Sequence, residues 1–218
     1  RRITEARLKI ESTGERSKFE SLSIQYRATG FIVSANHVLT ARHVIDDCKR
    51  VTVTKDSQQI DSRTVAVSSM ADLGLLITNR RFEDVAKFRR QHISVGNTVL
   101  KYGYSIWEPA VGPWTKGSIT SQWGVNSGGR TDMNLLEYDA PTYGGDSGGP
   151  LLDQSGHVVG IVVSGARTRF NAVTSDAAEF FLDTNFVMYE EGDSTEDLNL
   201  QAVARQAKDF TVEVECWQ

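Results

Sequence analysis

The sequence has few cysteines and no long apolar run. Its two cysteines, Cys48 and Cys216, allow at most one bridge, so the 218-residue chain is not a small domain held together by several disulfides. Such sparse cysteine favours a reducing compartment, and we expect an intracellular, cytoplasmic location. No apolar run reaches the roughly 18 residues of a membrane-spanning helix, and the charged start is not a signal peptide. We therefore expect no membrane segment, while membership of a larger polyprotein or multidomain protein stays open.

Excess positive charge is also missing. Lysine and arginine total 24 against 28 aspartates and glutamates, a net charge of −4, which offers no bulk attraction to a polyanion. Nucleic acid is therefore not an expected partner. His37 and His43 are six residues apart, with no cysteine or acidic ligand at a useful spacing, so no metal or other cofactor is expected.

Glycine, by contrast, is plentiful. The chain has 18 glycines and only 4 prolines, and short runs of Val, Ile, Thr and Ser are broken by Gly, Asn, Asp and Ser. This pattern is typical of many short strands rather than of helices, and it predicts twelve strands between residues 19 and 174. The predicted class is all-β, with enough strands for a double β-barrel.

The chain divides at two charged stretches. Residues 80–95 show no alternation and are interpreted as a linker, so the predicted units are 1–90, 91–189 and 190–218. The last unit begins as an acidic hinge in which Ser194 and Asp197 match a helix-start capping box. A short helix over residues 198–209 and a terminal strand over 211–216, with alternating apolar residues, complete the prediction.

The clearest chemical signal is Gly-Gly-Asp-Ser-Gly-Gly-Pro at residues 144–150. A nucleophilic hydroxyl needs an exposed backbone that a substrate carbonyl can approach, and glycine permits this because it lacks Cβ. Ser147 is the candidate nucleophile, and the N–H groups of Gly145 and Ser147 are the candidate donors to an oxyanion. The alternative is a glycine turn that merely contains a serine. The presence of a suitable base and acid elsewhere in the chain must decide between these two interpretations.

The candidate base is His43, which follows an apolar strand in residues 39–45. The candidate acid is Asp72, at the start of the apolar run 72–77. A buried aspartate is costly unless it is paired, so we expect a buried Asp72 to orient the His43 ring. In the α/β-hydrolase fold the nucleophile comes first in the chain, then the acid, then the histidine. Here His43 and Asp72 precede Ser147, and the only histidine after Ser147 is His157, so that fold is excluded.

Three motifs together make the chain resemble the trypsin- and chymotrypsin-like serine peptidases: Thr40-Ala-Arg-His-Val44, Asp72-Leu-Gly-Leu-Leu76 and Gly145-Asp-Ser-Gly-Gly-Pro150. The resemblance implies a chymotrypsin-like double β-barrel with a site between the barrels and a short C-terminal helix and strand extension. It implies that His43 is the general base, Asp72 its orienting acid and Ser147 the nucleophile, with Gly145 and Ser147 as the oxyanion hole. Asp146 would hold the oxyanion loop in its active shape.

Within that superfamily, residues 138–147 resemble the HtrA (Deg) protease domains, while Pro141 and Thr142 also resemble the nucleophile loop of viral chymotrypsin-like proteases. Val44 after His43 and the few cysteines differ from the secreted digestive enzymes. Trypsin-type activation releases an Ile amino terminus, but Ile3-Thr-Glu-Ala lacks the usual apolar-glycine start. We therefore expect a peptidase that does not depend on cleavage at Ile3.

By analogy with the family, substrate would contact two segments of the second barrel. The residues concerned are Pro141, Thr142, Tyr143, Val163, Ser164 and Gly165. Pro141 stands where trypsin-type enzymes have an Asp, so a Lys or Arg preference is not expected. A small or medium uncharged side chain ranks first, Gln or Glu second and an aromatic third. The strand at 163–165 should accept an extended polypeptide by strand addition.

These observations predict a serine endopeptidase that works through an acyl-enzyme, with a processing or regulatory rather than a digestive role. A catalytically silent binding module that retains the protease fold is the alternative. A complete set of His43, Asp72 and Ser147 favours the enzyme, because a decayed copy is expected to have lost one of them.

Overall fold

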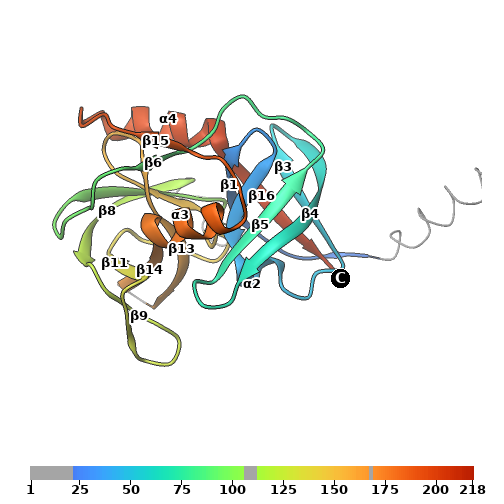
Figure 1. Ribbon diagram of the computed structural model, residues 1–218, viewed down its shortest axis with the longest axis horizontal. Coiled ribbons are helices and arrows are strands. Elements are labelled where there is room, and N and C mark those ends of the chain that lie inside the picture. The colour runs from blue at the N-terminus through green and yellow to red at the C-terminus, as the bar shows by residue number, and fades with distance from the viewer. Residues whose placement is uncertain (1–21, 106–111, 167–168) are drawn as a thin grey trace, which may run out of the picture.

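The computed structural model describes residues 22–105, 112–166 and 169–218. Ile3, considered above as a possible new amino terminus, lies outside these ranges. The described chain forms two barrels of mainly antiparallel strands that stand side by side (Figure 1). The predicted all-β, chymotrypsin-like double barrel is confirmed.

The first barrel is a closed ring of six strands. In order around the ring these are β1 (Ile24–Ser34), β16 (Thr211–Trp217), β3 (Arg50–Lys55), β4 (Gln58–Ser68), β5 (Leu73–Thr78) and β2 (His37–Ala41). A one-turn helix, α2 (Arg42–Ile45), follows β2 directly.

The second barrel is also a ring of six strands. Its order is β12 (Pro150–Leu152), β7 (Thr98–Tyr102), β8 (Trp114–Ser121), β11 (Leu135–Tyr138), β14 (Arg169–Thr174) and β13 (Val158–Ala166), with β12 paired back onto β13. Two short parallel strands, β6 (Lys87–Arg89) and β15 (Glu190–Gly192), extend the sheet beyond β13. A small hairpin of β9 (Gly124–Val125) and β10 (Thr131–Asp132) projects from it.

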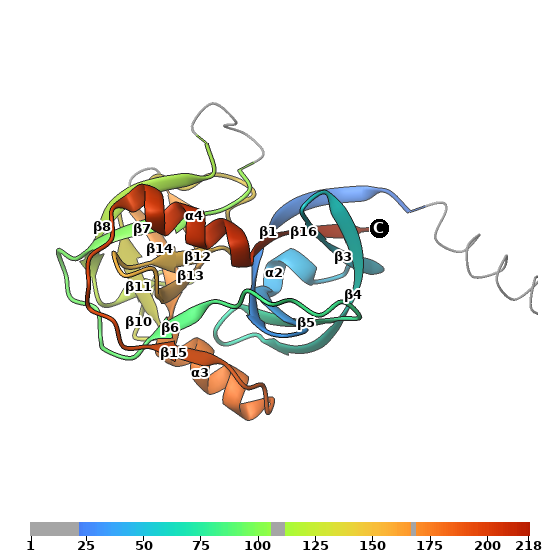
Figure 2. The same cartoon turned by 90° about the horizontal axis from the view of Figure 1, so that it is seen from above.

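Two longer helices cover the second barrel. α3 (Ser175–Thr184) follows β14 and packs against β13, and α4 (Leu200–Phe210) packs against β7 (Figure 2). The helix predicted near the C-terminus is confirmed, but its predicted cap is wrong. Asn199 is the N-cap, and its side chain accepts a hydrogen bond from Ala202 N. Ser194 and Asp197 lie five and two residues before Asn199, in a stretch that belongs to no helix or strand.

The terminal strand lies in the first barrel rather than in a separate tail. β16 pairs with β1 on one side and with β3 on the other, and the C-terminus emerges at the first barrel in Figure 2. The predicted strand is confirmed. It pairs within the first barrel, whereas the sequence assigned it to a separate unit, 190–218. Both ends of the described chain therefore build the barrel that carries His43 and Asp72.

One buried apolar cluster runs through both barrels, and a second lies within the second barrel. Phe31 of the first barrel and Phe88 of β6 are both fully buried, with ring centroids 6.3 Å apart. Leu152 and Val212 belong to the same buried cluster. Burial of these apolar side chains stabilises the two barrels as a unit. Residues of one barrel are therefore held at fixed positions relative to residues of the other.

Candidate active site

His43 is positioned by the end of β2 and by Asp72. Its ring Nδ1 lies 2.7 Å from Asp72 Oδ2, and its backbone N–H donates to Asp72 Oδ1 at 3.0 Å. Arg42 N–H in turn donates to the Asp72 carbonyl. An ionised carboxylate can only accept, so the ring proton lies on Nδ1 and Nε2 keeps a free lone pair. That is the tautomer a general base requires.

The expectation that Asp72 is buried is wrong. It precedes β5 rather than lying within it, its φ is +50°, and its side chain is 37% exposed, beside a His43 side chain that is 47% exposed. The backbone turns at Asp72 in the left-handed region, which Asp tolerates better than most residues. The carboxylate therefore faces the His43 ring and solvent rather than the barrel core.

Ser147 lies on a turn whose glycines are required by the close approach of the first barrel. Gly145 and Gly148 have φ of +98° and +82°. A Cβ on Gly148 would collide with Thr29 O and Thr40 Oγ1, and would come within 2.8 Å of Ala41 N. The turn with Ser147 is thus pressed against the end of β2, two residues before His43.

Thr29 of β1 fastens this turn to the first barrel. Its N–H donates to Ser147 O at 3.0 Å, and its hydroxyl donates to Gly145 O at 2.7 Å. The same hydroxyl accepts from Tyr104 N at 2.8 Å. Because Thr29 is fully buried, these bonds hold the turn in one position.

The structure thus brings His43 and Asp72 into direct contact and places the Ser147 turn beside the strand that leads to His43. In the part of the chain that is described, no hydrogen bond joins Ser147 to His43. Among the same residues, the amides of Gly145 and Ser147 have no hydrogen-bond acceptor, so both N–H groups are available to an incoming oxyanion.

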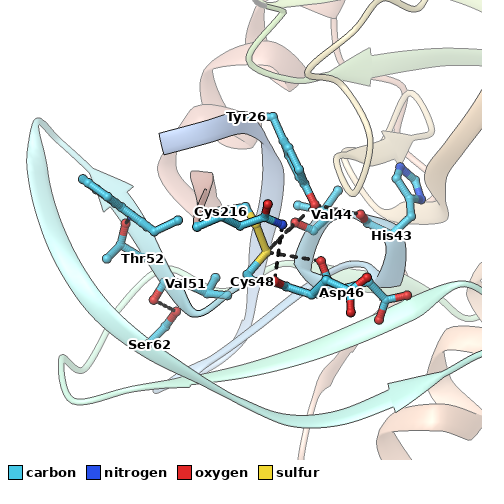
Figure 3. The surroundings of a disulfide bond; sticks show 12 residues. Tyr26, His43, Val44, Asp46, Cys48, Val51, Thr52, Ser62 and Cys216 are labelled. Carbon is cyan, nitrogen blue, oxygen red and sulfur yellow. Dashed lines mark hydrogen bonds between the residues drawn. A yellow bond between two sulfur atoms is a disulfide. The ribbon is translucent and has the colours of Figure 1, made fainter. Parts of the chain in front are cut away.

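A disulfide supports the helix that carries His43. Cys48 is bonded to Cys216 of β16, 168 residues away in sequence. Tyr26 lies over this bond, and its hydroxyl donates to His43 O at 3.3 Å. Figure 3 shows the His43 ring pointing away from the disulfide. The bond therefore ties α2 and the last strand together behind the ring.

The predicted specificity residues occupy two neighbouring places. Pro141 is exposed, and its carbonyl accepts from Thr115 Oγ1 at 2.6 Å. The Thr142 hydroxyl donates to Ala140 O and lies 2.9 Å from the Tyr138 hydroxyl. Burial raises the pKa of Tyr138, so this hydroxyl keeps its proton. Tyr143 is partly buried, and its N–H donates to Asp146 Oδ2 at 2.8 Å.

The other predicted residues lie on β13, next to the Ser147 turn. Gly148 N–H donates to Val162 O at 2.7 Å, and Val163 is buried. Ser164 and Gly165 pair with Asn171 and Phe170 of β14. Among the described strands, β12 pairs with β13 only as far as Ile161, so the opposite edge of residues 164–166 is unoccupied there.

The remaining histidines contact other groups. His37 Nδ1 lies 2.8 Å from Ser34 Oγ, His92 lies near Asp176, and His157 lies near Asp153. Burial lowers the pKa of His37 and of His157. Within the described residues, no cluster of three potential metal ligands is found, and no helix combines the length and apolar character needed to cross a bilayer.

Sequence reasoning missed two residues that contact the Ser147 turn, Thr29 and Lys101. Thr29 offered no signal, because its contacts arise only when the barrels meet. Lys101 did offer one: it interrupts the apolar strand at 98–102, and a lysine that is buried must be paired. It is fully buried, and its ammonium lies 2.7 Å from Asp146.

The chain is similar in sequence to known proteins. The sequence model of the trypsin-like peptidase domain matches residues 28–161, well over half of the chain. An uncharacterized protein of Sinorhizobium fredii, y4bJ, is 28% identical over 98% of this chain and 36% of its own length. A probable periplasmic serine endoprotease, DegP-like, of Brucella suis is 30% identical over 62% of this chain and 27% of its own length.

Solved structures share the fold. The active form of the Rv3671c protease of M. tuberculosis superposes with a TM-score of 0.64 at 23% identity, covering 76% of each chain. The chain spans about a third, or less, of the length of the two curated relatives named above.

The expected cytoplasmic location is wrong. The relative from Brucella suis is named as periplasmic, and Cys48 and Cys216 form the bond that a reducing compartment would leave open. A count of two cysteines could not reveal this, because only the fold brings residues 168 positions apart into contact. By its sequence and its fold, this chain belongs to the trypsin-like peptidase family.

Proposed function

We propose that the protein is a serine endopeptidase in which Ser147 is the nucleophile, His43 the general base and Asp72 the acid that orients His43. The observation that carries the proposal is the 2.7 Å contact between His43 Nδ1 and Asp72 Oδ2, made next to the glycine-rich Ser147 turn. The contact assigns the proton to Nδ1 and directs the basic Nε2 away from the carboxylate.

The mechanism is acyl transfer. Ser147 Oγ attacks the scissile carbonyl carbon while His43 Nε2 takes the hydroxyl proton. The negative charge that develops on the carbonyl oxygen is stabilised by the amides of Gly145 and Ser147. His43 then gives its proton to the leaving amine. A water molecule, deprotonated by His43, attacks the acyl carbonyl carbon, and His43 returns that proton to Ser147 Oγ as the acid product leaves. Asp72 stays ionised and stabilises the imidazolium.

The substrate is an extended polypeptide. No described strand lies on one side of β13 at residues 164–166. Two residues before this edge, Val162 O accepts a hydrogen bond from Gly148 N of the Ser147 turn. A peptide added there gains main-chain hydrogen bonds and passes the nucleophile. Small or medium uncharged side chains are the preferred choice, because the Thr142 hydroxyl already donates to Ala140 O and Pro141 contributes no charge.

The setting that fits the disulfide is extracytoplasmic. Relatives with periplasmic names and the Cys48–Cys216 bond both support it. We propose a processing or regulatory role of the HtrA type within a longer protein, since the relatives extend well beyond the matched part.

The test compares wild type with Ser147→Ala on a mixed-sequence peptide library, with every new terminus identified by mass spectrometry. Wild type should cut after small or medium uncharged residues, and Ser147→Ala should lose several orders of magnitude in rate. Equal cutting by both proteins, or no cutting by either, contradicts the proposal. Cuts confined to Gln or Glu would favour a viral-type processing specificity instead.

A further inference from the structure

The second barrel contains a lysine at a place where a charge is costly. Lys101 lies in β7, between Leu100 and Tyr102, and its side chain is fully buried. Loss of hydration lowers the pKa of Lys101, whereas the neighbouring Asp146 favours its charged form. Its Nζ donates to Asp146 Oδ2 at 2.7 Å, and Asp146 is fully buried as well. A buried ion pair of this kind is weak evidence for stability, so its role must be sought elsewhere.

Asp146 is the residue between the two amides of the candidate oxyanion hole. Besides Lys101, its carboxylate accepts from Tyr143 N at 2.8 Å and from Ser105 Oγ at 2.7 Å. Its own backbone N–H donates to Tyr143 O, and its carbonyl accepts from Gly149 N. Through its side chain and backbone, Asp146 therefore makes hydrogen bonds to both ends of the segment 143–149.

Gly103 shows how closely β7 and this turn are fitted. A Cβ on Gly103 would lie 2.5 Å from Asp146 Oδ1 and 3.0 Å from Asp146 Cα. The chain after β7 thus leaves room for the Asp146 carboxylate only because residue 103 has no side chain. Lys101 and Gly103 together form the surface against which the Asp146 side chain packs.

We propose that Lys101 is a positioning residue for catalysis: its ammonium holds Asp146 so that the amides of Gly145 and Ser147 converge on the oxyanion. The inference rests on the proposed function. Because the cation is part of the chain's own barrel, the turn needs no newly released amino terminus to reach its active shape.

The test separates positioning from stability with a charge-neutral pair. Lys101→Met alone leaves the Asp146 carboxylate buried and unpaired, so both the melting temperature and kcat should fall. In Lys101→Met/Asp146→Asn the stranded charge is gone, and the melting temperature should return toward wild type. Lys116→Met, an exposed lysine on the paired strand β8, is the matched control and should change neither.

The deciding readout is kcat of the double variant. We expect it to remain about 10²–10³-fold below wild type, the loss typical of a damaged oxyanion hole, with KM changed far less. Recovery of kcat along with the melting temperature would overturn the inference and leave Lys101 a structural residue. Ser147→Ala is measured in the same assay: if wild type is no faster than Ser147→Ala, the proposed function itself has failed, and this inference fails with it.

Discussion

Cys216, in the last strand of the chain, is disulfide-bonded to Cys48, three residues beyond the helix that carries His43. The bond joins two segments of the first barrel whose sequence separation is 168 residues. It fastens β16 next to β1 and β3, and β16 is the strand that closes the barrel bearing His43 and Asp72. The C-terminal strand is therefore part of the structure that supports the candidate site.

Reduction of this disulfide should destabilise the first barrel. A cross-link that closes so long a loop is expected to contribute about 2–5 kcal/mol to the free energy of unfolding. Dithiothreitol should lower the melting temperature of wild type, and peptidase activity should be lost at correspondingly lower temperature. The Cys48→Ser/Cys216→Ser variant should resemble reduced wild type and show no response to reductant. A wild-type melting temperature that is the same with and without reductant would contradict the prediction.

Asp72→Asn should reduce kcat by about 10⁴-fold, because an amide in that place favours the wrong tautomer of His43. The fold should persist, since Asp72 is partly exposed and lies outside β5. Kinetics of peptide cleavage measure the effect. Asp46→Asn is the control: Asp46 also lies close to His43 in sequence, but its carboxylate pairs with Arg42. A small, equal effect of both substitutions would argue against the assigned role of Asp72.

Thr29→Val should impair both stability and activity. The substitution keeps the side-chain shape but leaves Gly145 O and Tyr104 N without their 2.7 and 2.8 Å partners, which should cost about 1–3 kcal/mol. Because Gly145 supplies one of the candidate oxyanion amides, kcat should fall as well.

Thr52→Val is the matched comparison for Thr29→Val. Thr52 is also fully buried and makes two side-chain hydrogen bonds, to Glu215 and from Trp217, but these lie within the first barrel. It should lower the melting temperature and leave kcat unchanged. If Thr29→Val affected only the melting temperature, Thr29 would have no part in shaping the Ser147 turn.

Glu179 on α3 should make stability depend on pH. Burial, with the nearby charges of Asp176, Glu191 and Asp183, raises its pKa to about 7. One carboxylate oxygen of Glu179 is buried and has no hydrogen-bond partner in the described chain. The folded state therefore binds a proton on Glu179 more tightly than the unfolded state does. Proton binding by Glu179 stabilises the fold fully below about pH 4.5, and this stabilisation is lost as the pH rises to about 7.

Melting temperatures at pH 5 and pH 8 measure this effect. Glu179→Gln should flatten the difference between the two pH values and should be more stable than wild type at pH 8. Glu196→Gln, which changes an exposed glutamate, should leave the wild-type profile intact. An identical pH profile for Glu179→Gln and wild type would show that Glu179 does not titrate in this range.

Local patterns were enough to predict the strand-rich class, the glycine-rich turn around Ser147 and the pairing of His43 with Asp72. Turn glycines and β-branched runs each express a preference of the nearby backbone, so neighbouring residues carry that information. The pairing of Asp72 with His43 was predicted from the cost of burying an aspartate, and the contact forms although Asp72 is 37% exposed. The terminal strand was predicted for the same reason, since alternation of apolar and polar residues is local.

The partners of these elements were decided only by tertiary structure. Three contacts join segments that lie far apart in the chain. β16 pairs between β1 and β3, Cys216 bonds to Cys48, and Thr29 and Lys101 contact the Ser147 turn. Such contacts depend on how the two barrels close and pack, and no single segment encodes them. Local sequence thus determined which residues were chemically able to form the site, and barrel closure, driven by burial of the shared core, decided which of them meet.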